Sequence, residues 1–445
     1  MGRKLCVSVC SLNQWSLDFQ GNYVRILDSI RQAKLFQSQY RSGPELEICG
    51  YSCDDYFYES DTYLHSWQVL TRLLLETTTN NIICDIGMPV IHRNLAYNCR
   101  VIILNGKILF IRPKQVLCDE GNYKERRWFS PWTKDRQIEE YQLPRFVQEH
   151  IKQQTCPIGD AILQTNDTQI GFESADELLS PKSCHVNLYL DGCELISNSS
   201  SKHFRLRKTL IDDINKATEK CGGVYLLSNM RGCDGDRLYF DGITVISSNG
   251  QLIQHGSQFS LQECEVRSAI IDLEDIRSYR LSKRSYQSQG TNSDAYPRIR
   301  VEFSLSAQHD VFIPVSPPME WKSVTKEEEI ALGPACWLWD YLRRSQANGF
   351  FLALSGGVDS TSVACIVFSM CYLVFMEIER QGTNQSNDVL RDLRRIVNDI
   401  NYRPRSPQEL CSKLLVTCFM QHSNNNSELS KTHATNLSSE IGSGL

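Results

Sequence analysis

The amino-acid sequence predicts an α/β fold built as two units joined by a linker. Along residues 1–280, strand-like and helix-like segments alternate, which is typical of sheets covered by helices. A second alternation begins near residue 326, where an amphipathic helix pattern leads into a short apolar run, a glycine loop and another apolar helix pattern. Hydrophobic residues are 41% and charged residues 22% of the 445 residues, so each unit can bury an ordinary core.

The segments of the first unit predict its strands and helices in chain order. Strands are expected for LCVSVCSL, ELEICGY, NIICDIGMPVI, NCRVIILNGKILFIRPK and HVNLYL. Helices are expected for NYVRILDSIRQAKLF and SWQVLTRLLLETT, which carry apolar residues at helical spacing. Asn-Gly-Lys at 105–107 indicates a tight hairpin turn between two strands. GFESADELL at 171–179 has the pattern of a strand that ends in a turn.

The remainder of the chain changes character twice. Residues 281–325 are polar and rich in turn residues and proline, which predicts a linker that runs across a surface. Residues 326–445 begin with the amphipathic helix KEEEIALGPACWLWDYLRRSQANG, followed by GFFLAL as a short buried strand. TSVACIVFSMCYLVFMEIER is expected to form a helix, and LCSKLLVTCFM a helical turn followed by a second strand.

Composition argues against several kinds of partner and compartment. A net charge of −5 with mixed acids and bases does not favour nucleic-acid binding. The N-terminal apolar run is too short for a signal sequence, and we expect no membrane span. The 18 cysteines are spread along the chain and many lie in apolar runs, which favours reduced core thiols. These features predict a cytoplasmic protein.

The hexapeptide SGGVDS lies between the second unit's apolar strand and its next helix. Gly356 and Gly357 let the backbone approach an anion closely, and the helix N-terminus directs free N–H groups at it. Ser355 and Ser360 can donate hydroxyl hydrogens, and Asp359 suits a bridging Mg²⁺. Two glycines alone would equally fit an ordinary turn capped by Ser360 or Asp359, but the whole hexapeptide in this context favours phosphate binding. The candidate ATP-binding residues are Ser355, Gly356, Gly357, Val358, Asp359, Ser360, Thr361 and Ser362.

Three positions in the first unit suit amide hydrolysis through a thioester. That chemistry needs a nucleophile, a carboxylate that moves its proton, and a cation near the developing oxyanion. Glu45 follows a Gly-Pro turn and suits the carboxylate, and Lys114 ends a strand and suits the cation. The turn that would carry the nucleophile has Ala175, which offers no nucleophilic atom. Taken alone, either charged residue would fit a surface position.

The order and context of these residues resemble the nitrilase superfamily, whose Glu-Lys-Cys triad lies on an αββα sandwich. SGGVDS resembles the pyrophosphate loop of ATP pyrophosphatases, and the Walker pattern is absent. The two together resemble the glutamine-dependent NAD⁺ synthetases, from residue 1 almost to the end. The segments that carry this resemblance are GPELEICGY, DIGMPVIHRN, YNCRVI, EGNYKERRWFSPW, GCDGDRLYFDG, GSQFSL, LEDIRSYR, LGPACWLWDYLRRS and LSGGVDS.

The resemblance implies a fold, an activity and a set of site residues. Residues 1–280 would form the nitrilase-like sandwich and release ammonia from glutamine. Residues 326–445 would begin a doubly wound nucleotide-binding domain, where ATP and Mg²⁺ adenylate deamido-NAD⁺ and ammonia displaces AMP. A homo-oligomer is also expected. The triad positions fall on Glu45, Lys114 and Ala175, and the glutamine-binding positions on Tyr123, Ser200, Lys202 and Lys208.

The sequence departs from the family pattern in two places and leaves the function open. Ala175 replaces the nucleophilic cysteine, and Lys202 replaces the second serine of a Ser-x-Ser pair that holds glutamine. The second domain is also expected to be incomplete. The glutaminase is therefore expected to be inactive. The alternatives are a pseudoenzyme that acts as an assembly partner and, less well supported, a stand-alone amidase.

Overall fold

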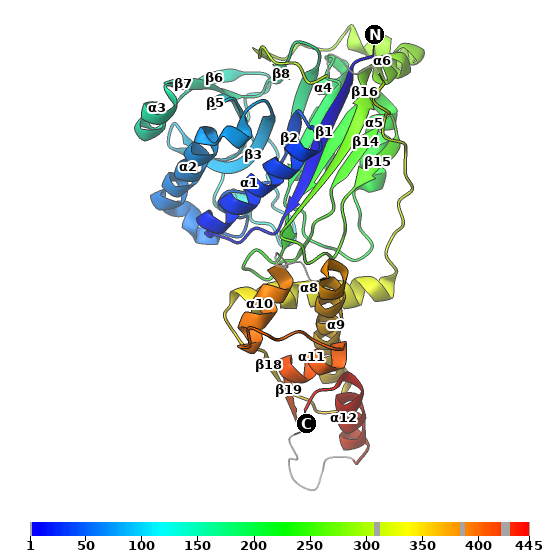
Figure 1. Ribbon diagram of the computed structural model, residues 1–445. Coiled ribbons are helices and arrows are strands. Elements are labelled where there is room, and N and C mark those ends of the chain that lie inside the picture. Colours follow the sequence, from blue (N-terminus) through cyan, green and yellow to red (C-terminus); the bar gives the residue numbers. More distant parts are fainter. Residues whose placement is uncertain (1, 307–311, 383–387, 420–427, 445) are drawn as a thin grey trace.

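The computed structural model describes residues 2–306, 312–382, 388–419 and 428–444. Two sheets stack face to face in the N-terminal part, with helices on both outer sides, and a smaller, mostly helical part lies below them (Figure 1). The predicted α/β fold class is confirmed for both parts.

The first sheet has eight strands in the order β16-β1-β2-β3-β4-β5-β7-β6. Its strands are β1 (Lys4–Leu12), β2 (Tyr40–Ser42), β3 (Ile83–His92), β4 (Leu95–Leu104), β5 (Lys107–Pro113), β6 (Ile138–Gln142), β7 (Thr155–Gly159) and β16 (Cys264–Asp272). The expected hairpin joins β4 to β5, where Asn105 and Gly106 both have positive φ.

The second sheet has seven strands in the order β15-β14-β11-β10-β9-β8-β17. They are β8 (Ile162–Gln164), β9 (Gln169–Ser174), β10 (Leu195–Ser200), β11 (Val224–Asn229), β14 (Val245–Ser248), β15 (Gln251–His255) and β17 (Arg298–Arg300). A separate small ribbon pairs β12 (Arg231–Gly232) with β13 (Phe240–Asp241).

The helices of the N-terminal part cover the outer faces of the two sheets. They are α1 (Phe19–Leu35), α2 (Ser60–Leu75), α3 (Arg145–Ile151), α4 (Cys184–Leu190), α5 (Ile211–Cys221), α6 (Leu273–Ser282) and α7 (Arg284–Gly290), with the 3-10 turns η1 (Asp54–Tyr58), η2 (Thr77–Thr79), η3 (Glu125–Arg127) and η4 (Ala175–Leu179).

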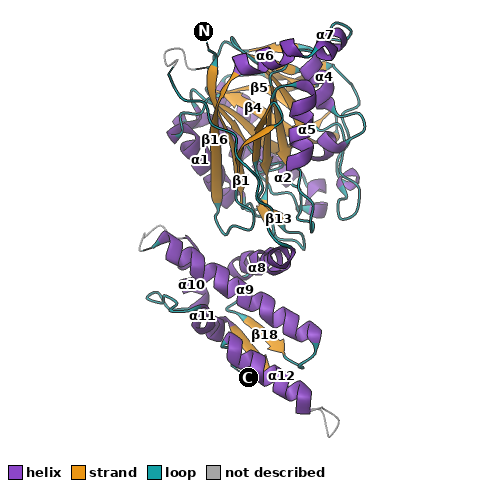
Figure 2. Cartoon of the chain, turned by 90° about the vertical axis from the view of Figure 1, so that its right-hand side faces the viewer, coloured by secondary structure: helices purple, strands orange, loops and turns teal. Residues whose placement is uncertain are grey.

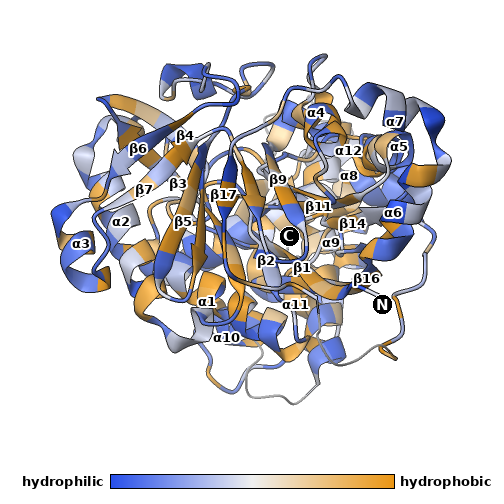
Figure 3. Cartoon of the chain, turned by 90° about the horizontal axis from the view of Figure 1, so that it is seen from above, coloured by the Kyte–Doolittle hydropathy of each residue, from blue (hydrophilic) through white to orange (hydrophobic). Residues whose placement is uncertain are grey.

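The alternating side chains of the strands divide the interior into three layers. In β1, Val7 and Val9 face the core between the two sheets, which also holds Leu226 of β11. Cys10 and Leu12 of β1 instead pack under α1 and α2. A third cluster lies under α4 and α5 on the other outer face. Much of β5 and β9 is accordingly coloured hydrophobic in Figure 3. This layering is the predicted αββα sandwich.

The C-terminal part contains a parallel pair of strands wrapped by helices (Figure 2). Its elements are α8 (Lys326–Arg344), β18 (Phe350–Ala353), α9 (Val358–Gln381), α10 (Asp388–Val397), α11 (Pro407–Leu414), β19 (Leu415–Cys418) and α12 (Glu428–Ile441). The predicted order of helix, strand, helix, helical turn and strand is confirmed.

Three local expectations were wrong. HVNLYL forms helix α4, because a short apolar run fits either periodicity and here the helix buries Leu188 and Tyr189. ELEICGY forms a turn with Leu46 at φ 51°, because its carboxylates point to buried cations. The β18 strand is not buried: Phe351 is 72% exposed, since β19 is its only strand neighbour within the described residues.

Part of the range 281–325, predicted as a linker, has structure of its own. Helix α7 lies in it, and β17 adds a parallel strand beside β8. Ser306 bridges to Leu5, and the Ser316 hydroxyl accepts a hydrogen bond from the Ile270 N–H at 2.9 Å. The described residues of this range therefore run along the sandwich surface and are held there. The domain boundaries themselves stay a prediction.

Helix α9 has the length and apolar composition that would allow a helix to cross a membrane, with a mean hydropathy of 1.9. The sequence analysis expected no segment with the length and apolar composition of a membrane span, and for α9 this expectation was wrong. One face of α9 is buried in the C-terminal core through Ala364, Val367 and Met370, and the core helix of a protein passes the same test. The absence of a membrane partner stays a prediction.

Helix α8 fixes the C-terminal part to the sandwich. Asn13 donates a hydrogen bond to Asp340 at 2.9 Å, and Arg344 donates to the Asn13 carbonyl at 2.6 Å. Glu263 of the sandwich pairs with Arg343 and Arg344. Burial opposes the charge of Glu263, but these guanidinium groups outweigh burial and hold its pKa at about 2. The junction is therefore a buried ionic network, and both parts contribute to it.

Candidate functional site

The structure brings Glu45 and Lys114 into direct contact although 69 residues separate them. Glu45 lies in the turn after β2, and Lys114 follows the last residue of β5. Lys114 Nζ donates to Glu45 Oε1 at 2.6 Å, and Asn98 Nδ2 donates to the same oxygen at 2.8 Å. Both side chains are buried. The surface-charge alternative is therefore excluded for these two residues.

Glu125 is a third charged member of the site, and the sequence analysis gave it no role. Lys114 Nζ donates to Glu125 Oε1 at 2.8 Å, and the Tyr51 hydroxyl donates to the same oxygen at 2.6 Å. The Cys118 N–H donates to Glu125 Oε2 at 3.0 Å. Glu125 lies on η3 between Lys124 and Arg126, and a charged run of this kind gives no sign that its carboxylate turns inward.

The buried Lys114 ammonium group thus contacts two buried carboxylates, those of Glu45 and Glu125. Burial raises the pKa of Glu45 to about 7; Lys114 opposes the rise, whereas the charge of Glu125 adds to it. Burial opposes the charge of Lys114, but Cys118, Glu125 and Glu45 outweigh it and raise the pKa of Lys114 well above its usual range. Near neutral pH the site therefore has a permanent cation and a carboxylate that can take up or release a proton.

Ala175, at the predicted nucleophile position, lies in a tight buried turn. Ala175 begins η4, is buried and has φ 43°, a left-handed conformation that is uncommon for any residue with a side chain. Ser174 and Glu177 form a capping box around it. Glu177 also accepts from Arg112 Nη1 at 2.6 Å and from the Gln115 N–H at 2.5 Å. The turn is therefore tied to the segment that follows Lys114.

A thiol lies in this site, on the loop after β5 and in contact with the residue that follows Ala175. Cys118 Sγ lies 3.4 Å from Lys114 Nζ and donates to Asp176 Oδ2 at 3.3 Å. Asp176 also pairs with Lys202 through its other oxygen. Cys118 and Ala175 belong to the same buried cluster. Cys118 was not predicted as a site residue, because it lies outside the 171–179 turn and no motif marks it.

The four predicted glutamine-binding residues fall into two groups. The Tyr123 hydroxyl accepts from the His203 N–H at 3.0 Å and donates to the Ser201 carbonyl at 3.3 Å. Ser200 ends β10, and its buried hydroxyl has no hydrogen-bond partner among the described residues. Lys202 lies beside these residues, and its ammonium group pairs with the Asp176 carboxylate.

Lys208 lies apart from this group. It is exposed and lines a separate cavity of about 550 Å³ together with Trp321 and Lys326. No described interaction joins Lys208 to Glu45 or Lys114, so its predicted role stays untested.

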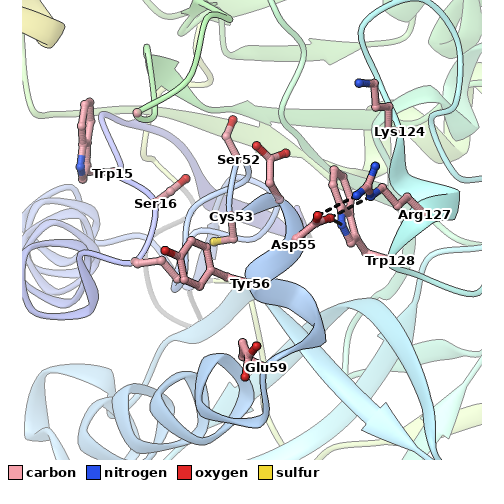
Figure 4. A pocket seen from close by; sticks show the side chains of 13 residues that line it. Trp15, Ser16, Ser52, Cys53, Asp55, Tyr56, Glu59, Lys124, Arg127 and Trp128 are labelled. Atoms are coloured by element: carbon pink, nitrogen blue, oxygen red, sulfur yellow. Dashed lines mark hydrogen bonds and ion pairs between the residues drawn. The ribbon is translucent and has the colours of Figure 1, made fainter.

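A larger opening beside η1 is separate from the Glu45 site. It has a volume of about 570 Å³ and is lined by Trp15, Asp55, Lys124, Arg127 and Trp128 among others (Figure 4). Asp55 accepts from Arg127 Nε at 2.8 Å and from Trp128 Nε1 at 3.0 Å. Asp55 and Arg127 thus pair with each other, and none of the predicted site residues lines this opening.

The SGGVDS loop has the geometry of an anion site. Gly357 caps α9 without any side-chain capping bond, so the N–H groups of the first turn stay available to a ligand. Gly356 has φ 77°. Ser360 Oγ lies 3.0 Å from Ser355 Oγ and 3.2 Å from the Ser355 nitrogen. The loop is open to solvent, with Val358 81% exposed.

Asp359, the acidic residue of this loop, could bind Mg²⁺ only if a phosphate group supplied further ligands. Asp359 is exposed and lies in the first turn of α9. Within the described ranges there is no group of three or more His, Cys, Asp or Glu residues that could hold a metal. Mg²⁺ commonly binds one or two carboxylates and takes its other ligands from phosphates and water. A single carboxylate beside a phosphate loop matches that chemistry.

Comparisons with known proteins support the sequence motifs. The family model described as carbon-nitrogen hydrolase matches residues 6–281. The chain is 55% identical over 445 residues to the glutamine-dependent NAD(+) synthetase of Macaca fascicularis, 54% to that of Homo sapiens and 46% over 450 aligned residues to that of Saccharomyces cerevisiae. Each match covers all of this chain and 62% of the relative. The chain therefore spans about 62% of the length of these relatives.

Two solved structures share the fold. A glutamine-dependent NAD(+) synthetase from Cytophaga hutchinsonii matches with a TM-score of 0.77 at 23% identity, over 99% of this chain and 64% of that one. A second, from Acinetobacter baumannii in complex with ADP, matches with a TM-score of 0.68 at 15% identity over the same shares. Both matches span the sandwich and the C-terminal part together.

Proposed function

Because the chain belongs to the carbon-nitrogen hydrolase family, we propose that its sandwich binds the side-chain amide of glutamine beside Glu45 and Lys114. In this proposal the sandwich is the nitrogen-donor part of a glutamine-dependent NAD⁺ synthetase. The observation that carries the proposal is a pair of buried polar atoms without partners among the described residues. Glu45 Oε2 and Ser200 Oγ both lack a hydrogen bond there. Buried polar atoms normally have partners, so these two favour a polar ligand.

The charges of the site suit a carboxamide. The carbonyl oxygen of an amide gains negative charge when a nucleophile attacks, and the Lys114 ammonium can stabilise that charge. Glu45, with its pKa near 7, can accept a proton from an incoming group and return it to a leaving amine. Lys202 and Asp176 are 17% and 27% exposed at their side chains. They form the solvent side of the site, where the charged end of glutamine would lie.

The C-terminal part would bind the phosphates of ATP. The relative from Acinetobacter baumannii was solved with ADP, and the uncapped start of α9 with Ser355 and Ser360 supports a phosphate site here. When bound, ATP with Mg²⁺ would activate the carboxylate of deamido-NAD⁺ for attack by ammonia. The part played by this chain's residues is to hold the phosphates with backbone N–H groups and hydroxyls and to place Asp359 beside the metal.

A second candidate is a pseudoenzyme that binds glutamine or a partner without hydrolysing the amide. The observation that favours it is Ala175, since the turn has the shape of a nucleophile turn but no nucleophilic atom. A protein of this kind would bind glutamine and release no glutamate. Both candidate functions thus predict that glutamine binds, and they differ in whether its amide is hydrolysed.

Glutamine binding can be tested at Ser200. Ser200→Ala removes a free buried hydroxyl, and the loss of one hydrogen bond of about 1 kcal/mol should weaken glutamine binding by about 5–10-fold. Ser199→Ala is the matched control, because the Ser199 hydroxyl is already bonded to the Gly43 carbonyl at 2.7 Å. Isothermal titration calorimetry measures both. No heat with glutamine, or equal affinity for wild type and Ser200→Ala, would overturn the proposed site.

Phosphate binding can be tested at Gly357. A Cβ at Gly357 would meet only Ser355 Oγ, at 3.5 Å, so Gly357→Ala should fold normally and place its methyl group on the open side of the loop. We expect ATP–Mg²⁺ and pyrophosphate to bind at least about 10-fold more weakly. Gly444→Ala, whose added Cβ meets nothing within 4 Å, is the control. Fluorescence titration with a labelled ATP analogue measures the change; unaltered affinity in Gly357→Ala would refute the assignment.

A further inference from the structure

We propose that Cys118, on the loop after β5, is the nucleophile of the amide site in place of position 175. This inference rests on the proposed glutamine site and goes beyond it, because it gives a turnover role to a residue outside the 171–179 turn. It also replaces the expectation of an inactive glutaminase, which followed from Ala175 and Lys202. Three independent observations lead to it: the neighbours of the thiol, the free polar atoms beside it, and its position relative to solvent.

The first observation is that Cys118 has the neighbours that a nucleophilic thiol needs. Its sulfur lies 3.4 Å from the Lys114 ammonium, and its hydrogen points to Asp176 Oδ2 at 3.3 Å. A cation stabilises the thiolate, and a carboxylate can take the proton. The backbone N–H of Cys118 donates a hydrogen bond to Glu125, which holds the residue in place. Among the cysteines in the described ranges, Cys118 alone contacts Lys114.

The second observation is that the site around this thiol is built for a ligand. Lys114 joins Cys118 to Glu45, which is 2% exposed and has a free Oε2. Ser200, fully buried, has a free Oγ, and its carbonyl accepts from the Glu45 N–H at 3.4 Å. A bound carboxamide can donate from its NH₂ group to Glu45 Oε2 and accept a hydrogen bond from Ser200 Oγ with its carbonyl oxygen.

The third observation is that the thiol lies just inside the exposed end of the site. Asp176 contacts Cys118 with one oxygen and Lys202 with the other, and Lys202 and Asp176 are the members of this cluster that solvent reaches. An amide that enters past Lys202 therefore meets Cys118 before it reaches Glu45. Tyr123 is buried in the same cluster as Cys118 and packs on His203 at 4.8 Å between ring centres.

The reaction follows from these contacts. The Cys118 thiol gives its proton to Asp176 as sulfur forms a bond to the amide carbon, and the carbonyl oxygen, now negative, lies near Lys114. When the carbonyl re-forms, the carbon–nitrogen bond breaks, the proton passes to nitrogen and ammonia leaves. Glu45 then takes a proton from water, whose oxygen attacks the thioester carbon; the carbon–sulfur bond breaks, and Glu45 gives the proton to the leaving sulfur. The products are glutamate and the regenerated thiol, so atoms and charge balance.

The electrostatics require that proton transfer accompany bond formation. Burial raises the pKa of Cys118 well above its usual value, although Lys114 opposes the rise. The resting group is therefore a thiol. Burial also favours the neutral form of Asp176, but Lys202 outweighs it and lowers the pKa of that carboxyl. Asp176 is thus ionised at neutral pH and available to accept the thiol hydrogen.

The test is covalent trapping with a glutamine analogue that carries a diazo ketone in place of the amide. A nucleophilic thiol protonates the diazo carbon, displaces dinitrogen and forms a stable thioether. The full chain is incubated with the analogue, digested, and mapped by mass spectrometry, with and without excess glutamine. Cys118→Ala and Cys118→Ser are compared with Cys184→Ser, whose thiol is partly buried and donates to the Gln115 side chain at 3.0 Å. Glutamine binding to each variant is measured by calorimetry.

We expect an adduct on the peptide that contains Cys118, protected by glutamine, kept in Cys184→Ser and lost in both Cys118 variants. The Cys118 variants should still bind glutamine, since the thiol contributes little to ground-state binding. Glutamine binding without an adduct on Cys118 would overturn this inference and leave the proposed function standing. No glutamine binding by the wild-type chain would overturn the proposed function, and this inference with it.

Discussion

Replacement of Lys114 by methionine is expected to lower the free energy of unfolding by about 3–5 kcal/mol at pH 8. Lys114 is the only cation in contact with Glu45 and Glu125 among the described residues, at 2.6 and 2.8 Å. Without it, two buried carboxylates remain unpaired, and desolvation of an unpaired charge is costly. Methionine keeps the length of the side chain, so the loss reports the charge and not a cavity.

The loss should depend on pH in a direction that the pKa values fix. In the folded chain the pKa of Glu45 is raised to about 7 from 4.5, chiefly by burial. The folded state therefore binds more protons than the unfolded state between these values, and stability falls as pH rises through that range. Lys114 opposes this rise, so without it Glu45 holds its proton more tightly still. The difference between variant and wild type should be largest above pH 7 and shrink toward pH 5.

Urea denaturation at pH 5 and pH 8 measures both effects. Lys107→Met is the control, because Lys107 is exposed at the start of β5, and it should change the free energy of unfolding by less than about 0.5 kcal/mol. If Lys114→Met is as stable as the control at pH 8, the ionic description of the site is wrong.

The second large effect is expected at Glu177. Glu177→Ala should lower the free energy of unfolding by about 3–5 kcal/mol, because it leaves the buried Arg112 guanidinium without its carboxylate. It also removes the acceptor of the Ser174, Gln115 and Val116 N–H groups. These bonds tie the position-175 turn to the segment between Lys114 and Cys118. Labelling of Cys118 by the diazo ketone should therefore slow as well.

Two comparisons separate the structural role of Glu177 from an ordinary surface effect. Glu177→Gln keeps the shape and part of the hydrogen bonding, so its loss of stability should lie between wild type and Glu177→Ala. Glu120→Ala, an exposed carboxylate in the loop after Cys118, should be nearly neutral. Thermal unfolding followed by circular dichroism ranks the three. Equal stability for Glu177→Ala and Glu120→Ala would contradict the role assigned to the Glu177 network.

The sequence predicted the sandwich well because regular alternation carries most of that information. The sequence-based prediction failed where tertiary contacts, and not the residue periodicity, determine the structure of a short segment. ELEICGY has strand-like residues, but Glu45 and Glu47 are drawn inward to Lys114 and Arg41, and the chain forms a turn. HVNLYL is too short for its periodicity to decide between helix and strand.

The candidate site was predicted in part, and the missing part follows from geometry. Glu45 and Lys114 could be paired by resemblance, although only the fold shows that they touch. Glu125, Asp176 and Cys118 carry no sequence signal of their own. They become site residues because the loop after β5 folds back under the position-175 turn, and the Glu177 hydrogen bonds that hold it there cannot be read from residue spacing.

The central claim is that Cys118 performs the chemistry for which position 175 has no nucleophile. The most direct measurement is the rate of glutamate release from glutamine by the purified chain, compared with Cys118→Ala under the same conditions. The account predicts measurable release by the wild type and a loss of at least about 100-fold in the variant, because removal of the nucleophile removes most of the rate by itself. A wild-type chain that releases no glutamate, or a Cys118→Ala variant that keeps the wild-type rate, would contradict it.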